Sequence, residues 1–503
     1  MKRIIYKIIF LPVVFILLNT ACESLLDVEP SDTFSTTSYW KTEEHALAGI
    51  NGCYNALYPW RGLVHFMEFD LITSNSMPYN EANGTQAIGK GEHLSITPLI
   101  ETLWQNCYRG IGRTNTFLDN VPRCTMDENL KNRLIGEAKF LRAFFYFNLV
   151  DKFGGVPLIL EAPDAEKQAS LPRDTKEAVV EQILKDLTEA AAVLPLNYAT
   201  ADVGRVTRGA ALSLKARVLL YNARWKEAAE TAKTVMDLGV YELFNDYRYF
   251  FSEENKHNKE VIFNVEASEP DFTQNLNNDI VVLNRPSPLK ELVDKYQMTD
   301  GKSITESPLY NPAKPYENRD PRLLYTVTII GYPYNGKPIT QANVVTTGYG
   351  LKKYTSYKDN VESPQVTRTA FNLIYIRYAE VLLTYAEAQN EFSGPDASVY
   401  DAVNKVRNRP SVNMPKLPEG LTKDQMREAI RLERRIELTF EGIYYSDILR
   451  WKTAEIENNG AMHDANGVAI VIRKFNPNRD YLWPIPYNQI IQNPNLKQNP
   501  GWD

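Results

Sequence analysis

The stretch that decides the fold is "GRVTRGAALSLKARVLLYNARWKEAAETAKTVMDLG", residues 204–239. Apolar residues recur in it every three or four positions, which is the period of an amphipathic α-helix. A short turn near 222–224 divides the stretch into two helices. The second helix carries Ala228, Ala229 and Ala232 on one face, and these small side chains let it lie close against the first. The stretch therefore predicts a helix hairpin of the tetratricopeptide type.

The same pattern returns toward the carboxyl end of the chain. "RYAEVLLTYAEAQNEF" (377–392) and the segment at 398–409 predict a second pair, and a further helix is expected from Thr422 toward Glu441. Pairs of this kind stack into a right-handed solenoid with a broad concave surface. We therefore expect a mostly α fold on a tetratricopeptide-like helix-pair scaffold. Further helices are predicted at 41–58, 98–120, 129–153 and 173–194.

The middle of the chain differs from both flanks. "KEVIFNVEA" (259–267) and "LLYTVTIIGY" (323–332) alternate as strands do, and loops rich in asparagine, proline and glycine lie between them. Loops on a rigid frame are a common place for binding sites. We expect one body at 41–503. Its helical scaffold, about 41–240 and 370–503, carries a loop-rich half with a few short strands at about 240–370.

The first residues are typical of an export signal. Lys2, Arg3 and Lys7 surround a positive start, and Ile8–Leu18 form eleven apolar residues in a row. A bilayer core takes roughly 20 apolar residues, so this run is too short to span it. A charged start and a brief apolar core indicate a secretory signal peptide, and we expect residues 1–21 to be removed.

Cys22 follows directly after Thr20 and Ala21, and small residues before a cysteine are what a lipoprotein signal peptidase accepts. Asn19 departs from that pattern, because an apolar residue is usual at this position. We expect lipidation at Cys22, with residues 22–40 as a lipidated tether; the alternative is an ordinary cleaved signal peptide. Two or more acyl chains hold a protein stably, since each buried methylene contributes about 0.8 kcal/mol. The sequence therefore predicts a membrane contact through a lipid anchor.

Composition argues against several classes of function. The 503 residues include 62 acidic and 56 basic side chains, and the net charge of -6 argues against nucleic acid as a partner. Cys53, Cys107 and Cys124 remain beside Cys22, so at most one disulfide can form, and the pairing of Cys107 with Cys124 stays open. The five histidines include no pair four residues apart. We therefore predict no metal site and no cofactor.

A stripe of carboxylates is the one feature that suggests catalysis. In "LERRIELTFEGIYYSDILRW" (432–451), Glu433, Glu437 and Glu441 fall four apart on one helical face. Two carboxylates at a fixed separation are what glycoside hydrolysis needs, but like charges at this spacing destabilise a helix unless something neutralises them. A structural ion-pair network is therefore the favoured interpretation, with no catalytic residue. The arginines available for such a network are Arg377, Arg431, Arg434, Arg435 and Arg450.

A series of motifs runs in order along nearly the whole chain. It begins with Cys22, Leu26-Asp27 and Pro30, and with a helix ending in "GCYNALY". It continues through "EAKFLRAFFYFNLVDKFGGVPL", "GRVTRGAALSLKARVLLYNARW", "KEVIFNV", "YQMTDGK", "ENRDPRL", "RYAEVLLTYAEAQN" and "LERRIELTFEGIYYSDILRW", and it closes with "LWPIPYNQIIQNPNLKQNPGW". In these motifs and their order the chain resembles the SusD/RagB family of surface lipoproteins, which capture nutrients for an outer-membrane transporter.

The resemblance implies a fold, a function, a location and a partner. The fold is SusD-like, with helix pairs as the scaffold and a looped half that faces the ligand. The implied function is to capture an oligosaccharide or polysaccharide and deliver it to a TonB-dependent outer-membrane barrel of the SusC type, without catalysis. The implied location is the outer membrane, where a lipid anchor holds the protein facing the cell exterior. An inner periplasmic leaflet is the alternative location.

The ligand-binding residues are expected in loops. A pyranose ring has an apolar C–H face that stacks on an aromatic side chain, while its hydroxyls need paired donors and acceptors. Candidates are therefore aromatic residues that lie beside amides or arginine outside the helical period. Three segments provide them: 58–62, 75–86 and 271–286. The predicted ligand-binding residues are Trp60, Arg61, Tyr79, Asn80, Phe272, Asn275 and Asn278.

Three other functions fit parts of the sequence. A peptide-binding relative would use the same scaffold, with grooves that pair backbone amides instead of stacking sugar rings. A glycoside hydrolase would use the carboxylate stripe. An assembly protein would have no ligand of its own. The sequence does not distinguish the sugar, its linkage or its chain length.

Overall fold

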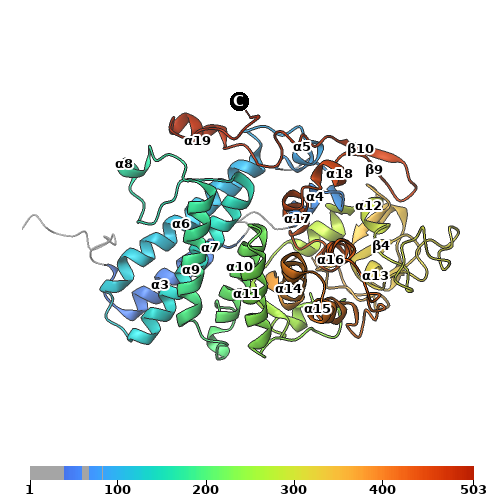
Figure 1. Cartoon of the computed structure of the whole chain (residues 1–503), viewed down its shortest axis with the longest axis horizontal. Coiled ribbons are helices and arrows are strands. Elements are labelled where there is room, and N and C mark those ends of the chain that lie inside the picture. Colours follow the sequence, from blue (N-terminus) through green and yellow to red (C-terminus); the bar gives the residue numbers. More distant parts are fainter. Residues whose placement is uncertain (1–38, 59–66, 82, 367, 503) are drawn as a thin grey trace, which may run out of the picture.

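The computed structural model describes residues 39–58, 67–81, 83–366 and 368–502. Figure 1 shows long helices packed side by side in one half of the molecule, while short strands, short helices and loops fill most of the other half. Helices from residues 378–450 lie between the two. This mostly helical architecture confirms the predicted fold class.

The long helices pack largely in the order in which they occur along the chain. Each of the main helices up to residue 437 contacts the next one along the chain, and the helix that follows the central loops packs back onto the first scaffold half. This arrangement is the predicted stack of helix pairs. The helices are α3 (Glu43–Asn55), α6 (Pro98–Asn120), α7 (Glu128–Phe153), α9 (Lys176–Val193), α10 (Arg208–Tyr221), α11 (Trp225–Asp237), α14 (Tyr378–Ser393), α15 (Ala397–Arg407), α16 (Lys423–Glu437) and α17 (Tyr444–Arg450).

The α10–α11 hairpin forms as its sequence predicts. The Thr207 hydroxyl accepts a hydrogen bond from the Ala210 amide at 3.2 Å and so caps the start of α10. Ala223 adopts a left-handed conformation with φ of 56°, which turns the chain between the helices. The small face of α11 is buried, and α11 packs against both α10 and α14. The hairpin therefore joins the two parts of the scaffold.

Helix α7 is buried on nearly all sides, as its apolar sequence requires. Sixteen of its residues are buried, including the run from Phe140 to Phe147. Helices α6 and α7 approach closely at Gly110, where an added Cβ would lie 2.4 Å from the ring of Phe145. Helix α7 ends at Gly154, which has a positive φ of 70°.

Five small antiparallel sheets of two strands each occur in the described part of the chain. Two of them join segments that lie far apart in the sequence: the strand near residue 77 pairs with one near residue 287, and the strand near residue 263 pairs with one near residue 375. The pairs are β1 (Ser76–Pro78) with β3 (Pro286–Pro288), β2 (Val261–Val265) with β8 (Leu373–Arg377), β4 (Val327–Ile329) with β7 (Tyr349–Leu351), β5 (Pro333–Tyr334) with β6 (Lys337–Pro338), and β9 (Gly460–His463) with β10 (Ala469–Arg473).

Two sequence predictions need correction. The segment 323–332 was expected as one strand, but its first residues belong to α13 (Arg322–Thr326) and only β4 is extended. Asp320 causes this, because its carboxylate accepts a hydrogen bond from the Arg322 amide at 3.0 Å and so starts a helical turn. The helix expected to run toward Glu441 ends at Glu437, because the chain turns through a left-handed Phe440.

Short helices complete the fold. They are α4 (Glu68–Leu71), α5 (Thr85–Lys90), α8 (Ala165–Gln168), α12 (Lys290–Val293), α18 (Ala454–Glu457), α19 (Tyr487–Gln492), the 3-10 turns η1 (Val121–Arg123), η2 (Thr200–Asp202), η3 (Glu253–Asn255) and η5 (Gln341–Asn343), and the π-helical turn η4 (Asn278–Val282). One hydrophobic cluster extends through both halves. Cys53, Cys107 and Cys124 are buried free thiols. Among the described residues, none of the helices has the length and apolar character needed to cross a bilayer.

Candidate functional site

The pairing of β1 with β3 brings two of the loops named from the sequence together. Tyr79 follows β1 directly, and its backbone amide donates to the carbonyl of Arg285 at 3.0 Å. The Tyr79 side chain is 51% exposed, and Asn80 beside it is also exposed. A large aromatic side chain with half its surface open is a platform on which a flat ligand can stack.

Charged groups cluster at Arg285, the residue to which the Tyr79 backbone is bonded. Arg285 donates from Nη2 to Glu68 Oε1 at 2.8 Å, and Asn83 donates to the same oxygen at 3.2 Å. Burial raises the pKa of Glu68 and of Asp279, and in both cases the Arg285 guanidinium opposes the rise. Arg285 therefore balances two carboxylates at once. We call this surface the β1–β3 face; it consists of Glu68, Tyr79, Asn80, Asn278, Asp279, Val282, Leu283 and Arg285.

The turn η4 forms the second side of the β1–β3 face. The Asn278 carbonyl accepts from the Leu283 amide at 3.0 Å, and the Arg285 amide donates to the Asp279 carbonyl at 2.9 Å. These bonds expose Val282 by 46% and Leu283 by 48%. Exposed apolar side chains therefore lie on the chain segment that pairs with the Tyr79 strand.

The predicted residues fall into separate places. Asn278 lies on the β1–β3 face with Tyr79 and Asn80. Asn275, which is exposed, precedes η4 and accepts the Asp279 amide at 2.9 Å through its carbonyl. Phe272 is partly buried and packs on Tyr58, with 5.4 Å between ring centroids, so it lies beside the end of α3.

Three predicted positions lie outside the described residues: Trp60, Arg61 and the lipidation site Cys22. The other ligand-binding assignments also stay predictions. The face also contains residues that were not predicted, of which Glu68, Asp279 and Arg285 are the charged ones. Arg285 lies inside the segment 271–286, so its position in a polar loop could have indicated a binding residue. Its partner Glu68 is 217 residues away in sequence, and no pattern in the sequence links the two.

The carboxylate stripe of α16 is an ion-pair network. Glu437 accepts from Arg377 at 2.7 Å, from Arg409 at 2.7 Å and from Arg322 at 2.9 Å. Burial disfavours the ionised form, but Arg409, Arg377 and Arg322 outweigh it and hold the pKa of Glu437 well below its usual range. Glu437 is therefore a permanently ionised acceptor whose oxygens are already bonded, which does not suit a general acid.

The partners in this network differ from those predicted. Only Arg377 was named correctly; the other partners of the stripe are Arg322, Arg407, Arg409 and Lys353. Arg434 on α16 and Arg450 on α17 instead bind Glu387 of α14 and Asp447 of α17. Arg435 pairs with Glu457 and Arg431 with Glu428.

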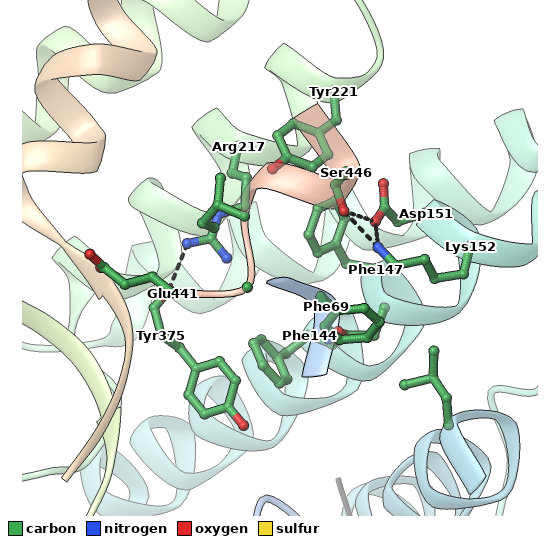
Figure 2. Close-up of a pocket in the computed structure, with 14 residues that line it drawn as sticks. Phe69, Phe144, Phe147, Asp151, Lys152, Arg217, Tyr221, Tyr375, Glu441 and Ser446 are labelled. Carbon is green, nitrogen blue, oxygen red and sulfur yellow. Dashed lines mark hydrogen bonds and ion pairs between the residues drawn. The ribbon is translucent and has the colours of Figure 1, made fainter. Parts of the chain in front are cut away.

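A small cavity with aromatic and polar lining lies where α7, α10 and α17 meet. Figure 2 shows Asp151, Lys152 and Ser446 bonded to one another at one side of it. The Lys152 ammonium donates to the Ser446 hydroxyl at 2.6 Å, and this hydroxyl donates to the Asp151 carboxylate at 2.6 Å. The cavity measures about 50 Å³, which is room for water and too small for a sugar ring. It therefore serves as a polar contact between the scaffold halves.

The fold and the surface together define a class of protein: a scaffold of helix pairs that carries loops and short sheets with exposed aromatic and planar polar groups. The chain belongs to the SusD family, whose family model matches residues 247–502. A second model, described as "Starch-binding associating with outer membrane", matches residues 26–220. The family resemblance of the sequence is thereby confirmed.

Similar proteins span almost the whole chain. SusD-like protein P2 of Formosa agariphila is 27% identical over 526 residues and covers 99% of both chains. A SusD-like carbohydrate-binding protein of Bacteroides fragilis has a TM-score of 0.85 at 27% identity, covering 92% of this chain and all of its own. A laminarin-binding SusD-like protein has a TM-score of 0.74 at 24% identity, with 92% and 100% covered.

Proposed function

We propose that the protein is a glycan-binding lipoprotein of the cell surface that captures oligosaccharides and delivers them to a SusC-like TonB-dependent outer-membrane transporter. The observation that carries the proposal is the β1–β3 face, where the half-exposed Tyr79 ring stands beside Asn80 and near Arg285. A sugar ring can stack on the tyrosine ring. Its hydroxyls can form bidentate hydrogen bonds with amide, carboxylate and guanidinium groups.

The relatives support a carbohydrate as the ligand. One solved structure is described as a carbohydrate-binding protein and another as laminarin-binding, and one matching family model is described as starch-binding. The same family description mentions association with the outer membrane. We propose that a lipid on Cys22 and a tether over residues 22–40 hold the body 41–503 at that membrane.

The protein binds its ligand without changing it. The carboxylate pair that would be needed for glycoside hydrolysis is occupied by arginine in the α16 stripe, and Glu433 accepts from Arg322 at 2.5 Å and from Arg407 at 2.9 Å. A pair of carboxylates that cannot exchange a proton with a glycosidic oxygen does not support acid catalysis. Capture followed by transfer to a partner is therefore the function that we favour over hydrolysis.

Calorimetric titration separates glycan binding from its rivals. The purified mature protein in detergent is titrated with neutral oligosaccharides of several linkages and with a peptide pool. We expect saturable heat from at least one oligosaccharide and none from the peptides. Saturable heat from peptides alone would favour the peptide-binding rival, and release of reducing ends during the titration would favour the hydrolase.

The proposed partner is tested separately. A tagged chain is extracted from outer membranes in mild detergent, and the proteins that remain bound after washing are identified by mass spectrometry. We expect a barrel of the TonB-dependent class in stoichiometric amount. Recovery of the chain without any barrel would contradict the delivery step but not glycan capture.

A further inference from the structure

A cleft that is separate from the β1–β3 face opens between the α9–α10 loop and strand β2. It consists of two adjoining cavities, one of about 460 Å³ and one of about 230 Å³. Val203, Gly204, Arg205 and Asn264 line both of them. Ligand pockets usually measure about 300–1,000 Å³, so the larger cavity alone has the size of a small-molecule site.

Gly204 shapes the boundary between the two cavities. Its φ of 97° lies in the left-handed region, and an added Cβ would lie 2.4 Å from Cγ of Glu266. The loop therefore approaches strand β2 as closely as a chain without a side chain permits. The two cavities open on the two sides of this contact.

Four of the tyrosines that the structure describes line the two cavities, which together we call the tyrosine cleft. Tyr198 and Tyr241 line the larger cavity, and Tyr54 and Tyr58 line the smaller one. Their hydroxyls are bonded to the protein: Tyr198 donates to the Val206 carbonyl at 2.9 Å and Tyr58 to the Glu266 carbonyl at 2.6 Å.

The other two tyrosines are fixed in the same way. The Tyr54 hydroxyl donates to Glu137 at 3.0 Å, and the Tyr241 hydroxyl lies 3.2 Å from that of Thr207. Anchored hydroxyls leave the rings little freedom to lose when a ligand arrives. The cleft therefore offers aromatic walls that are already in place.

Charges in the cleft are balanced within the protein. Arg205 donates to Glu137 at 2.9 Å and to Asp202 at 2.9 Å, while His257 lies 3.0 Å from Glu266. Among the described residues that line the cleft, Arg205 is the arginine and is committed to carboxylates, and Lys259 donates to Glu242 at 3.2 Å. The remaining polar lining is rich in amides, which come from Asn51, Asn197, Asn258 and Asn264.

Tyrosine rings with amide side chains and balanced charge suit a neutral ligand rich in hydroxyl groups. We propose that the tyrosine cleft is a second saccharide-binding site, which takes a short neutral saccharide or one end of a longer chain. The class of ligand rests on the proposed glycan-binding function, whereas the cleft rests on the structure alone. Two sites on one protein raise the apparent affinity for a polysaccharide that reaches both.

Substitution of Val203 tests the cleft without touching the core. Val203 lines both cavities and is 39% exposed, so Val203→Trp fills the cleft at little cost to folding. The matched control is Val468→Trp, because Val468 is 58% exposed in the loop between β9 and β10. Asn197→Ala is a second, milder variant, since Asn197 is exposed. Each variant's thermal transition is recorded first.

The measurement is amide hydrogen exchange with and without a panel of neutral gluco-, manno- and xylo-oligosaccharides. We expect a ligand to slow exchange at 196–205 and 257–266 by about tenfold in the wild type, in Val468→Trp and in Tyr79→Ala. The slowing should disappear in Val203→Trp and weaken in Asn197→Ala.

Each other outcome is decisive. Protection confined to 76–81 and 278–286 would overturn the second site and leave the proposed function intact. Protection at the cleft alone would support the second site and overturn the β1–β3 face as the binding surface. Absence of protection in both regions across the whole panel would overturn both proposals.

Discussion

Tyr79 is the residue whose surroundings most favour ligand contact. It combines a 51% exposed ring with a backbone fixed by the bond to Arg285. We expect Tyr79→Ala to weaken oligosaccharide binding by about tenfold, or ~1.4 kcal/mol, because a stacking surface is lost. Calorimetry measures the change. Phe392→Ala is the control, since Phe392 is equally exposed at the end of α14; equal losses in the two variants would contradict this assignment.

A second prediction concerns His93 and the dependence of stability on pH. It is 2% exposed, packs against Trp502 and has no hydrogen-bond partner for either ring nitrogen among the described residues. Burial, assisted by the charge of Arg479, lowers its pKa to about 3. An unfolded histidine titrates near 6.5, so between these values the unfolded chain binds a proton that the folded protein does not. Stability should therefore fall as the pH drops from about 6.5 toward 3.

His93→Phe removes this proton linkage. The free energy of unfolding is compared between His93→Phe and the wild type at pH 7.5 and at pH 4.5. We expect the difference to shift in favour of the variant by about 2 to 3 kcal/mol at the lower pH. Urea unfolding at the two pH values measures the change. Parallel pH profiles for the two proteins would show that His93 is protonated in the folded state.

Among the structural elements, α16 was predicted from the sequence, but most of the basic residues that pair with its carboxylates were not. The period of three and four residues is local, so the helix and the positions of Glu433 and Glu437 on it were predicted from the chain itself, whereas Glu441 lies beyond the end of the helix. The identity of most counter-ions was not predicted, because Arg322, Arg407 and Arg409 come from segments that meet α16 only in the folded molecule. Local chemistry also overrode the strand pattern at 323–332, where Asp320 starts a helix.

The candidate site follows the same rule. Tyr79 and Asn278 were found from the composition of their loops, but the pairing of β1 with β3 joins residues more than 200 positions apart. Nothing in the period of either loop indicates that partner. The partners Glu68 and Arg285 therefore became visible only with the fold, as did the tyrosine cleft, whose walls come from four separate segments, 51–58, 196–207, 239–241 and 257–266.

Helix α16 also carries a stability prediction. Glu437→Gln leaves Arg322, Arg377 and Arg409 without the charge that they share, and breaking a buried ion pair costs about 3 to 5 kcal/mol. Urea unfolding measures the loss. Glu230→Gln is the control, because Glu230 is 65% exposed and lies 3.9 Å from Lys226; it should change stability by less than about 0.5 kcal/mol. Release of reducing sugar by the wild type that stops in Glu437→Gln would instead make the stripe catalytic.

The proposed function of the whole molecule requires that a lipid on Cys22 hold it at the membrane. We expect Cys22→Ser to move the protein from the membrane fraction to the soluble fraction and to abolish incorporation of labelled palmitate, since two or more acyl chains supply the stable membrane contact. Immunoblots of the fractions and autoradiography measure both effects. Retention of the unlabelled variant in the membrane would indicate another attachment, and export of an unlabelled wild type would indicate an ordinary signal peptide.

We propose that loops carried by a helical scaffold hold a glycan at the β1–β3 face. The decisive measurement is a crystal structure of the protein with the oligosaccharide that binds best in calorimetry. We expect a sugar ring stacked on Tyr79, with its hydroxyls bonded to Asn80, Asp279 or Arg285. A sugar bound elsewhere with the β1–β3 face empty, or a peptide in its place, would show that this face does not hold the glycan.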